Sequence, residues 1–354
     1  MPQLALLSFD RTHIHPGDRI CVAISGGADS VALLLATHAA NTAKRDSLGI
    51  GLSAVHVHHG IRADEADADR QFVEGLCAQL NIPLHLHHAN VPARAAETGE
   101  TIEEAARSVR YDYFRSLIAS GQADSILTAH TLDDQAETVL MKLLRGAWTE
   151  GLSGIHPIVQ VSAAHPGKIL RPFLCTRRAE IEAFLKERNQ PWREDSTNTD
   201  TAYTRNRIRH ELLPRLRQYN PSLDQTLANL AEVAREEEAR WQSELNRLLP
   251  QVLLPGKPVR GGGRSVGTAP GPSAVAIELD RLRSFDSALR RRVLRAAARQ
   301  LGVRLSFDET SRLLALCGFL ELPTVTARTG ASLHLSGQLR AERSHRELRL
   351  FLQQ

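Results

Sequence analysis

Cysteine is scarce in this sequence, and no two cysteines have the spacing of a metal site. Cys21, Cys77, Cys175 and Cys317 are scattered, without a CxxC pair among them. This pattern excludes an obvious zinc finger and argues against a disulfide framework. We therefore expect four free thiols in a reducing compartment.

Long apolar runs are also absent. The longest run falls far short of the ~20 apolar residues that span a bilayer. The N-terminus does not combine a basic segment, an apolar run and a cleavage site of small residues, as a signal peptide does. We expect a cytoplasmic protein that does not cross a membrane.

Lysine is rare, and arginine supplies nearly all the basic side chains. The net charge is +4. Arginine binds phosphate groups through two parallel hydrogen bonds, so its abundance can indicate phosphate recognition. A GC-rich genome also favours arginine over lysine, and both explanations of the abundance stay open. The hydrophobic share of 42% and the charged share of 24% are those of an ordinary soluble protein. A length of 354 residues predicts two domains.

Strands and helices alternate along the first half of the chain. The predicted strands are Arg19–Ile24, Gly51–Val57, Ile82–His87 and Asp124–Ala129, and the predicted helices are Ser30–Ala40, Asp64–Leu80, Thr101–Ala119 and one from Asp133 to about Leu144. This order predicts an α/β fold with a parallel, doubly wound sheet, which binds ligands at the carboxyl ends of its strands. Ser25–Ser30, His56–Arg62 and His130–Glu137 lie at such ends.

The second half is mainly helical. The predicted helices are Thr176–Asn189, an arginine-rich one at Asn206–Gln218, Leu223–Leu249, Leu282–Leu301 and Phe307–Phe319. Asn220-Pro221 marks a predicted boundary, which gives a catalytic domain of residues 1–220 and a smaller helper domain of residues 221–354. Pro255–Ser273 is interpreted as a linker, and the residues after Leu322 as short strands.

The segment Ser25-Gly26-Gly27-Ala28-Asp29-Ser30 is a candidate phosphate loop. Glycines let the backbone approach a ligand and adopt conformations closed to other residues. The N–H groups at the start of the following helix attract anions, and Asp29 beside a phosphate makes sense if a magnesium ion lies between them. It is not a Walker loop, since no Gly-Lys-Ser/Thr follows. The alternative is a plain glycine turn with Ser30 as the helix N-cap.

A run of acids follows the strand that ends near His130. Asp133 and Glu137 are four residues apart and share one helix face, while Asp134 and Thr138 share the adjacent face. Such carboxylates can bind magnesium, hold an ammonium group or accept a proton from an amine. The alternative is that acids in a first helical turn only favour the helix dipole.

Several motifs resemble known enzymes. Val22–Leu33 (VAISGGADSVAL) resembles the signature of the N-type ATP pyrophosphatases, which split ATP between its α and β phosphates. The order and spacing of four further segments are similar to those of the tRNA(Ile)-lysidine synthetase family, and the likeness covers roughly residues 15 to 220. These segments are Val55–Arg62, Glu103–Tyr111, His130–Gly146 and Trp192–Arg209.

The resemblance implies a PP-loop fold and a specific reaction. The family uses ATP and Mg²⁺ to adenylate the wobble cytidine of tRNA(Ile) with a CAU anticodon, and free L-lysine then displaces AMP. ATP would contact Ser25, Gly26, Gly27, Ala28, Asp29 and Ser30. Magnesium would be held by Asp29 and Asp134. The implied catalytic residues are Asp29, Arg110, Asp133, Glu137 and Arg205, the last with its neighbours Asn206, Arg207 and Arg209.

Bland alternatives remain for three groups of residues. One alternative for Arg110 is an ordinary surface pair with Glu103 or Glu104 on a solvated helix. The histidines His56, His58, His59, His85, His87 and His88 suggest zinc, although alternation along strands explains them more simply. Arg292, Arg295 and Arg299 share one helix face, which suits either an RNA backbone or solvent.

Other functions stay open at this point. A tRNA thiolation enzyme would need cysteines for an iron–sulfur cluster, and a small-molecule amide ligase would not need arginine-rich helices. A catalytically silent RNA-binding protein fits poorly with the intact acids. Compared with the family, the chain has a bulky Trp148 in a loop expected near the site, and we expect one C-terminal domain where family members carry two. The oligomeric state (a homodimer is one option), the adenine contacts and the general base stay undetermined.

Overall fold

The computed structural model describes residues 7–61, 63–161, 166–194, 204–254, 257–258, 264–265 and 274–353. The chain divides into two compact units, Met1–Glu236 and Glu237–Gln354. The division falls within the long helix α10 (Leu223–Val252). At Asn220-Pro221 the chain only turns, from helix α9 (Leu213–Tyr219) into α10.

The first unit is built on a six-stranded sheet in the order β3-β2-β1-β4-β6-β5. The strands are β1 (Arg19–Ala23), β2 (Gly51–His58), β3 (Leu84–His88), β4 (Ser125–Leu127), β5 (Ile158–Gln160) and β6 (Lys168–Leu170). All neighbours pair in parallel except β5 with β6. The predicted parallel α/β fold is confirmed, and β5, which was not predicted, adds an antiparallel edge strand.

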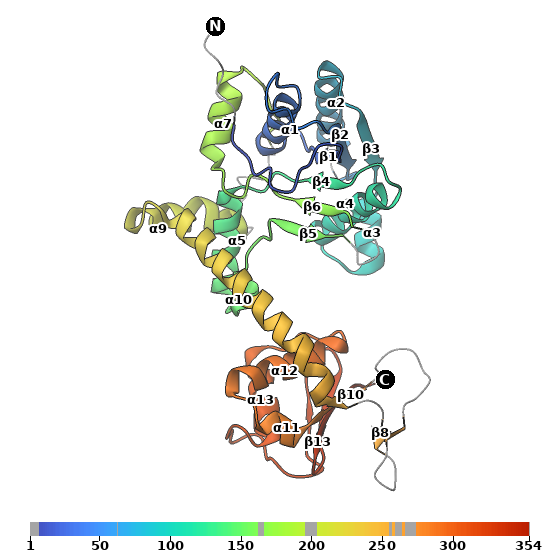
Figure 1. Cartoon of the computed structure of the whole chain (residues 1–354), viewed down its shortest axis with the longest axis vertical. Coiled ribbons are helices and arrows are strands. Elements are labelled where there is room, and N and C mark those ends of the chain that lie inside the picture. Colours follow the sequence, from blue (N-terminus) through green and yellow to red (C-terminus); the bar gives the residue numbers. More distant parts are fainter. Residues whose placement is uncertain are drawn as a thin grey trace. The chain divides into compact units, whose positions relative to one another are not determined.

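Helices cover both faces of this sheet (Figure 1). Helices α1 (Ala28–Asn41), α2 (Ala63–Gln79) and α7 (Arg178–Glu187) pack on one face, and α3 (Val91–Thr98) and α4 (Ile102–Ala119) pack on the other. Helix α5 (Leu132–Leu144), which is followed by the short α6 (Thr149–Leu152), packs with α9 and α10 in a separate core. Strand β1 shows the alternation that produces two cores. Ile20 and Val22 face the core shared with α1, α2 and α7, whereas Cys21 faces the core shared with α3 and α4.

The strand order places the predicted motifs side by side. From β1 the chain passes to β2 and β3 on one side, and it then returns to form β4 on the other side of β1. This reversal opens a crevice at the carboxyl ends of β1 and β4. The loop of Ser25–Gly27 follows β1, and the start of α5 follows β4, so both motifs lie at the crevice.

Three details differ from the sequence prediction. Helix α1 begins at Ala28, so Ser30 lies inside its first turn instead of capping it. Helix α3 was not predicted. The arginine-rich helix consists of α8 (Thr204–Arg207), the π-helical segment η2 (Ile208–Leu212) and α9. Pro214 at the start of α9 has no N–H to donate, which favours a wider turn before it.

The second unit packs helices against an antiparallel sheet in the order β11-β12-β13-β10-β7. The elements are β7 (Leu253–Leu254), β10 (Ala274–Glu278), α11 (Leu279–Arg283), α12 (Ser287–Gln300), α13 (Phe307–Cys317), β11 (Ser332–His334), β12 (Leu339–Arg343) and β13 (Glu347–Leu352). The predicted helices and short terminal strands are confirmed. Asp286 caps α12 by accepting a hydrogen bond from the Leu289 N–H, which splits the single helix predicted at Leu282–Leu301.

The predicted linker at Pro255–Ser273 lies mostly outside the described residues. Within it the structure describes only the short paired strands β8 (Lys257–Pro258) and β9 (Arg264–Ser265). In the described part of the chain, no helix combines the length and the apolar character needed to cross a bilayer.

The arginines of α12 are bonded within the unit and do not form the free stripe that we predicted as one alternative. Arg292 is only 8% exposed, forms two hydrogen bonds to Glu238 at 2.8 and 3.0 Å, and covers the ring of Trp241. Arg295 donates to the Leu305 carbonyl oxygen at 2.9 Å. Because Arg292 is buried, it is unsuited to binding an RNA phosphate, and its role is structural.

Arg292→Ala is therefore expected to lower the free energy of unfolding by about 2–3 kcal/mol, since Glu238 loses its guanidinium partner in a partly buried place. Urea unfolding measures this loss. Arg304→Ala is the control, because Arg304 is exposed in the same unit. Unchanged stability together with a weaker salt dependence of RNA binding would contradict the structural role.

Candidate active site

A cleft of about 1040 Å³ opens in the first unit at the carboxyl ends of β1, β2 and β4. Its walls come from the phosphate loop, the ends of these strands, α4, the start of α7 and the arginine-rich segment α8–η2. Segments that are distant in the sequence and were singled out by their motifs therefore line one cavity. Many of the lining side chains are charged, as expected for a site that binds charged ligands.

The phosphate loop gets its shape from one of its two glycines. Gly26 has a φ of +97°, which L-residues rarely adopt, whereas Gly27 has an ordinary φ of −70°. The carbonyl oxygen of Gly26 accepts a hydrogen bond of 2.9 Å from the N–H of Arg193. The expectation that both glycines adopt special conformations is thus correct for Gly26 alone.

The start of α1 offers unused backbone donors to the cleft. Gly27 is the N-cap and makes no side-chain cap. The N–H groups of Ala28, Asp29 and Ser30 open the helix, where no carbonyl oxygen of a preceding turn is available to them. The Ser30 hydroxyl donates to the Gly27 carbonyl oxygen at 2.9 Å and lies 3.1 Å from the Ser25 hydroxyl. Free N–H groups at the start of a helix are the usual donors of an anion-binding site.

Gly26→Ala and Gly27→Ala test this loop as a pair. A Cβ at Gly26 would lie 3.3 Å from Cγ of Arg193 and meet a left-handed φ, so we expect a loss of about 1–3 kcal/mol in unfolding free energy. A Cβ at Gly27 would make only ordinary contacts, the nearest at 3.5 Å, and we expect a change within about 0.5 kcal/mol. Chemical denaturation measures both values, and equal losses would contradict the assigned geometry.

Asp29 presents a buried carboxylate to the cleft. Its Oδ2 atom lies 3.6 Å from Arg178, and its Oδ1 atom is buried without a hydrogen-bond partner among the described residues. Burial raises the pKa of Asp29 to about 6, while the positive charge of Arg178 opposes this rise. With this orphaned carboxylate oxygen beside the phosphate loop, Asp29 would be a suitable ligand for a divalent cation.

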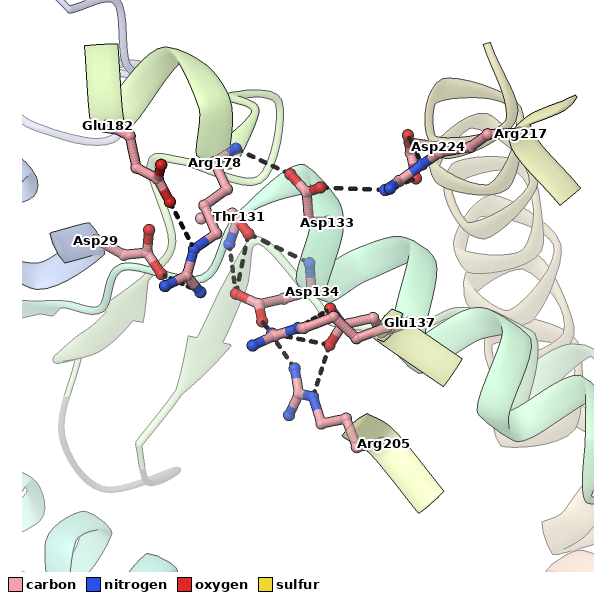
Figure 2. Close-up of polar contacts among 11 residues, drawn as sticks. Asp29, Thr131, Asp133, Asp134, Glu137, Arg178, Glu182, Arg205, Arg217 and Asp224 are labelled. Carbon is pink, nitrogen blue, oxygen red and sulfur yellow. Dashed lines mark hydrogen bonds and ion pairs between the residues drawn. The ribbon is translucent and has the colours of Figure 1, made fainter. Parts of the chain in front are cut away.

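Asp134 and Glu137 form a network with two arginines (Figure 2). Arg205 donates to Glu137 Oε2 and to Asp134 Oδ1, both at 2.8 Å. Arg209 donates to Glu137 Oε1 at 2.5 Å, to Glu137 Oε2 at 3.0 Å and to Asp134 Oδ1 at 3.3 Å. The side chain of Glu137 is only 1% exposed. Glu137 is not among the described residues that line the cleft. Its effect on the cleft is indirect, because it binds Arg205 and Arg209, which do line it.

Asp134 is also occupied from its own helix. Its Oδ2 atom accepts from the N–H and the hydroxyl of Thr131, the N-cap of α5, at 2.9 and 3.1 Å. Burial works against ionisation of Asp134, but Arg205 and the Thr131 N–H outweigh it and lower the pKa of this carboxyl. Both oxygens therefore already have donors, which makes Asp29 the more available of the two predicted magnesium ligands.

Asp133 points away from its predicted partner Glu137. Its Oδ2 atom accepts from the backbone N–H of Arg178 at 2.9 Å, and its Oδ1 atom accepts from Arg217 at 3.2 Å. It is not among the described residues that line the cleft. The shared helix face predicted for Asp133 and Glu137 does not bring them to one site, because each meets a different element.

Arg110 lines the cleft without a carboxylate partner among the described residues. The predicted alternative was a pair with Glu103 or Glu104, but Glu104 instead completes the capping box of α4 with Thr101. Burial lowers the pKa of the nearby His59 to about 4, with a further contribution from the Arg110 charge. Burial lowers the pKa of Arg110 and the charge of Glu103 opposes this lowering, although no hydrogen bond or ion pair joins these two side chains among the described residues.

The histidines serve the sheet and the cleft wall and do not form a metal site. His56 is buried, and its Nδ1 atom lies 2.8 Å from the Ile24 carbonyl oxygen. His87 stacks on Tyr113. Across the described ranges, no group of three or more His, Cys, Asp or Glu side chains is placed to hold a metal ion.

Arg178, Arg193 and Tyr111 line the cleft without having been predicted as site residues. Arg178 begins α7 and carries no motif signal, so its role was not readable from the sequence. Arg62 and residues 195–203 of the Trp192–Arg209 motif lie outside the described residues. Trp148 precedes α6 and is not among the described residues that line the cleft.

Comparison with known proteins adds independent evidence. The PP-loop domain model matches residues 5–216. The chain is 39% identical over 282 residues to a tRNA(Ile)-lysidine synthase of Solibacter usitatus, covering 79% of this chain and 56% of that protein. It is 35% identical over 346 residues to that of Geobacter sulfurreducens, covering 96% and 67%. The chain thus spans about half to two thirds of the length of these relatives.

A solved structure supports the fold alone. The U34-tRNA thiolase NcsA of Methanococcus maripaludis superposes with a TM-score of 0.51 at 18% sequence identity, covering 64% of this chain and 75% of that chain. The PP-loop domain model matches more than half of the chain, and the loop and the crevice lie where this fold places them. Together with the two relatives above, this shows that the chain belongs to the PP-loop family and, within it, to the group of the tRNA(Ile)-lysidine synthases.

Proposed function

We propose that this protein ligates free L-lysine to C2 of the wobble cytidine of tRNA(Ile) with a CAU anticodon, at the expense of ATP. The products are lysidine in the tRNA, AMP and pyrophosphate. In this proposal residues 1–220 form the catalytic domain, and residues 221–354 form a domain that helps to bind tRNA. The names of the relatives and the charged cleft support it.

The chemistry takes place in two displacements. The C2 oxygen of cytidine attacks the α-phosphorus of ATP, and the bond to the β-phosphate oxygen breaks, which releases pyrophosphate. The amine of lysine then attacks C2, loses a proton, and displaces AMP, which carries the former C2 oxygen away. Adenylation is needed because that oxygen is otherwise a poor leaving group.

The residues of the cleft suit the first displacement. The N–H groups of Ala28, Asp29 and Ser30, which open α1, would bind the departing pyrophosphate. Asp29, through its unpartnered oxygen, would hold magnesium, which when bound neutralises phosphate charge. Arg205 and Arg209, fixed by Asp134 and Glu137, can stabilise negative charge that develops on the phosphate undergoing attack.

One observation carries the proposal: the phosphate loop and five guanidinium groups lie in a single cleft. The guanidinium groups are those of Arg110, Arg178, Arg193, Arg205 and Arg209. For the thiolation alternative, Cys21 and Cys77 are buried, and no metal-holding group is found among the described side chains.

The test combines purified protein, ATP, magnesium, labelled lysine and a transcript of the minor isoleucine tRNA. We expect label in the tRNA together with release of pyrophosphate. The matched control is the same transcript with the wobble cytidine replaced by uridine, which should accept no label. Turnover of ATP with a small acid and ammonia, without RNA, would refute the proposal.

A further inference from the structure

Arg178 is the first residue of α7, and its side chain extends toward the phosphate loop. Its Nη1 atom lies 3.6 Å from Asp29 Oδ2, and its Nε atom donates to Glu182 Oε1 at 3.3 Å (Figure 2). The side chain lines the cleft and is 35% exposed. Two carboxylates thus hold one guanidinium group at the edge of the nucleotide site.

The contact with Arg178 leaves the two carboxylate oxygens of Asp29 in different environments. Oδ2 faces the cation of Arg178, while Oδ1 remains buried and unpartnered. Carboxylates that bind metals are usually fixed by a further partner on their other oxygen, and this partner orients them. We propose that Arg178 is the positioning residue that fixes Asp29 for the magnesium of the ATP complex, and that Asp133 acts through Arg178. This inference rests on the proposed function.

Asp133 explains why Arg178 is well placed. The Asp133 carboxylate accepts the first N–H of α7, that of Arg178 itself, at 2.9 Å. Its other oxygen is tied to Arg217, which also donates to the fully buried Asp224 at 2.8 Å. Asp133 is therefore held from both sides and anchors the helix end from which Arg178 reaches Asp29.

This arrangement assigns Asp133 a task other than contact with the substrate. Asp133 lies outside the described lining of the cleft, and its oxygens are used by Arg178 and Arg217. Loss of Asp133 should free the start of α7 and weaken the hold on Asp29. Loss of Asp133 should weaken metal binding at Asp29, as loss of Arg178 does, but to a smaller extent.

Nucleotide binding without tRNA or lysine provides the test. Affinity for Mn²⁺·ATP is measured by electron paramagnetic resonance of free Mn²⁺, and affinity for ATP alone is measured by calorimetry in excess chelator. For Arg178→Ala we expect the Kd of Mn²⁺·ATP to rise about 10- to 100-fold. The Kd of metal-free ATP should change by less than about twofold, because Arg178 acts on Asp29 and not on the phosphates.

Three companion variants sharpen the result. Arg178→Lys keeps the charge and should recover part of the lost Mn²⁺·ATP affinity. Asp133→Ala should weaken Mn²⁺·ATP selectively, by less than Arg178→Ala does. Arg115→Ala, on α4, is the control, because it removes a surface arginine that is paired with Asp112 and should leave both affinities unchanged.

A double-variant cycle with Asp29→Asn ties the effect to its target. In the Asp29→Asn background, Arg178→Ala should cause no further loss of Mn²⁺·ATP affinity. Equal weakening of metal-bound and metal-free ATP would overturn the proposal, since Arg178 would then contact the nucleotide or support the fold. If Arg178→Ala fails to fold, the metal-selective loss in Arg178→Lys decides. A failed lysidine assay with this selectivity intact would reject only the proposed function.

Discussion

Asp29→Asn is expected to lower the rate of pyrophosphate release from ATP about 1000-fold in the presence of tRNA. The substitution keeps the shape of the side chain but removes the charge that attracts a divalent cation. It leaves the N–H groups at the start of α1 in place, so residual binding of ATP without metal should persist. Rapid-quench measurement of pyrophosphate on first turnover isolates this step from lysine attack.

The same variant should be at least as stable as the wild type in the nucleotide-free state above pH 6. The pKa of Asp29 in the folded protein is raised by burial to about 6, from an ordinary value of 3.8. A raised carboxyl pKa contributes stability that is complete below about pH 4 and is lost as the pH rises through about 6. Asparagine carries no charge and avoids this cost, so thermal melts at pH 8 should show no loss.

The control for both measurements is Asp46→Asn. Asp46 is 95% exposed and has a φ of +57°, which asparagine tolerates well, so both activity and melting temperature should stay unchanged. Wild-type rates of pyrophosphate release in Asp29→Asn would show that the assigned loop does not hold the metal and the phosphates.

Glu137→Gln is expected to lower the free energy of unfolding by about 2–3 kcal/mol and to impair adenylation strongly. Glu137 accepts three hydrogen bonds from Arg205 and Arg209 in a place that is 1% exposed. An amide supplies only one acceptor oxygen, and its NH₂ group would face guanidinium donors. Removing one partner of a buried charge network is costly, although the exposure of Arg205 and Arg209, 40% and 22%, moderates the loss.

Two measurements separate the possible roles of Glu137. Urea unfolding gives the stability, and single-turnover adenylation gives the effect on chemistry. Glu97→Gln, at an exposed position of α3, should change neither value. If adenylation falls while stability is unchanged, Glu137 contacts the substrate itself; a loss of both supports its role as the anchor of Arg205 and Arg209.

Much of the fold was predictable because its signals are local. A buried strand, a glycine turn and a buried helix follow one another within residues 19–41, and a parallel sheet places such turns at one edge. The alternation of strands and helices therefore located the phosphate loop and the crevice. Edge strand β5 and helix α3 were missed, because such short elements carry too few periodic positions.

The arginine-rich segment shows the limit of that reasoning. Arg205, Arg207 and Arg209 alternate along the segment, and a helix cannot direct all three the same way. Arg207 is exposed, while Arg205 and Arg209 reach Glu137. Spacing did not reveal which acid they would meet, since that acid is 68 and 72 residues away in the chain.

The sequence by itself determined the family, the sheet, the phosphate loop and some of the charged residues near it, because each depends on neighbours within a few turns of the chain. Only the tertiary structure decided how the acids of α5 are divided. Asp134 and Glu137 hold two arginines at the cleft, while Asp133 holds α7. A helical period orients side chains around their own axis, but the partner on each side depends on how α5, α7 and η2 pack together.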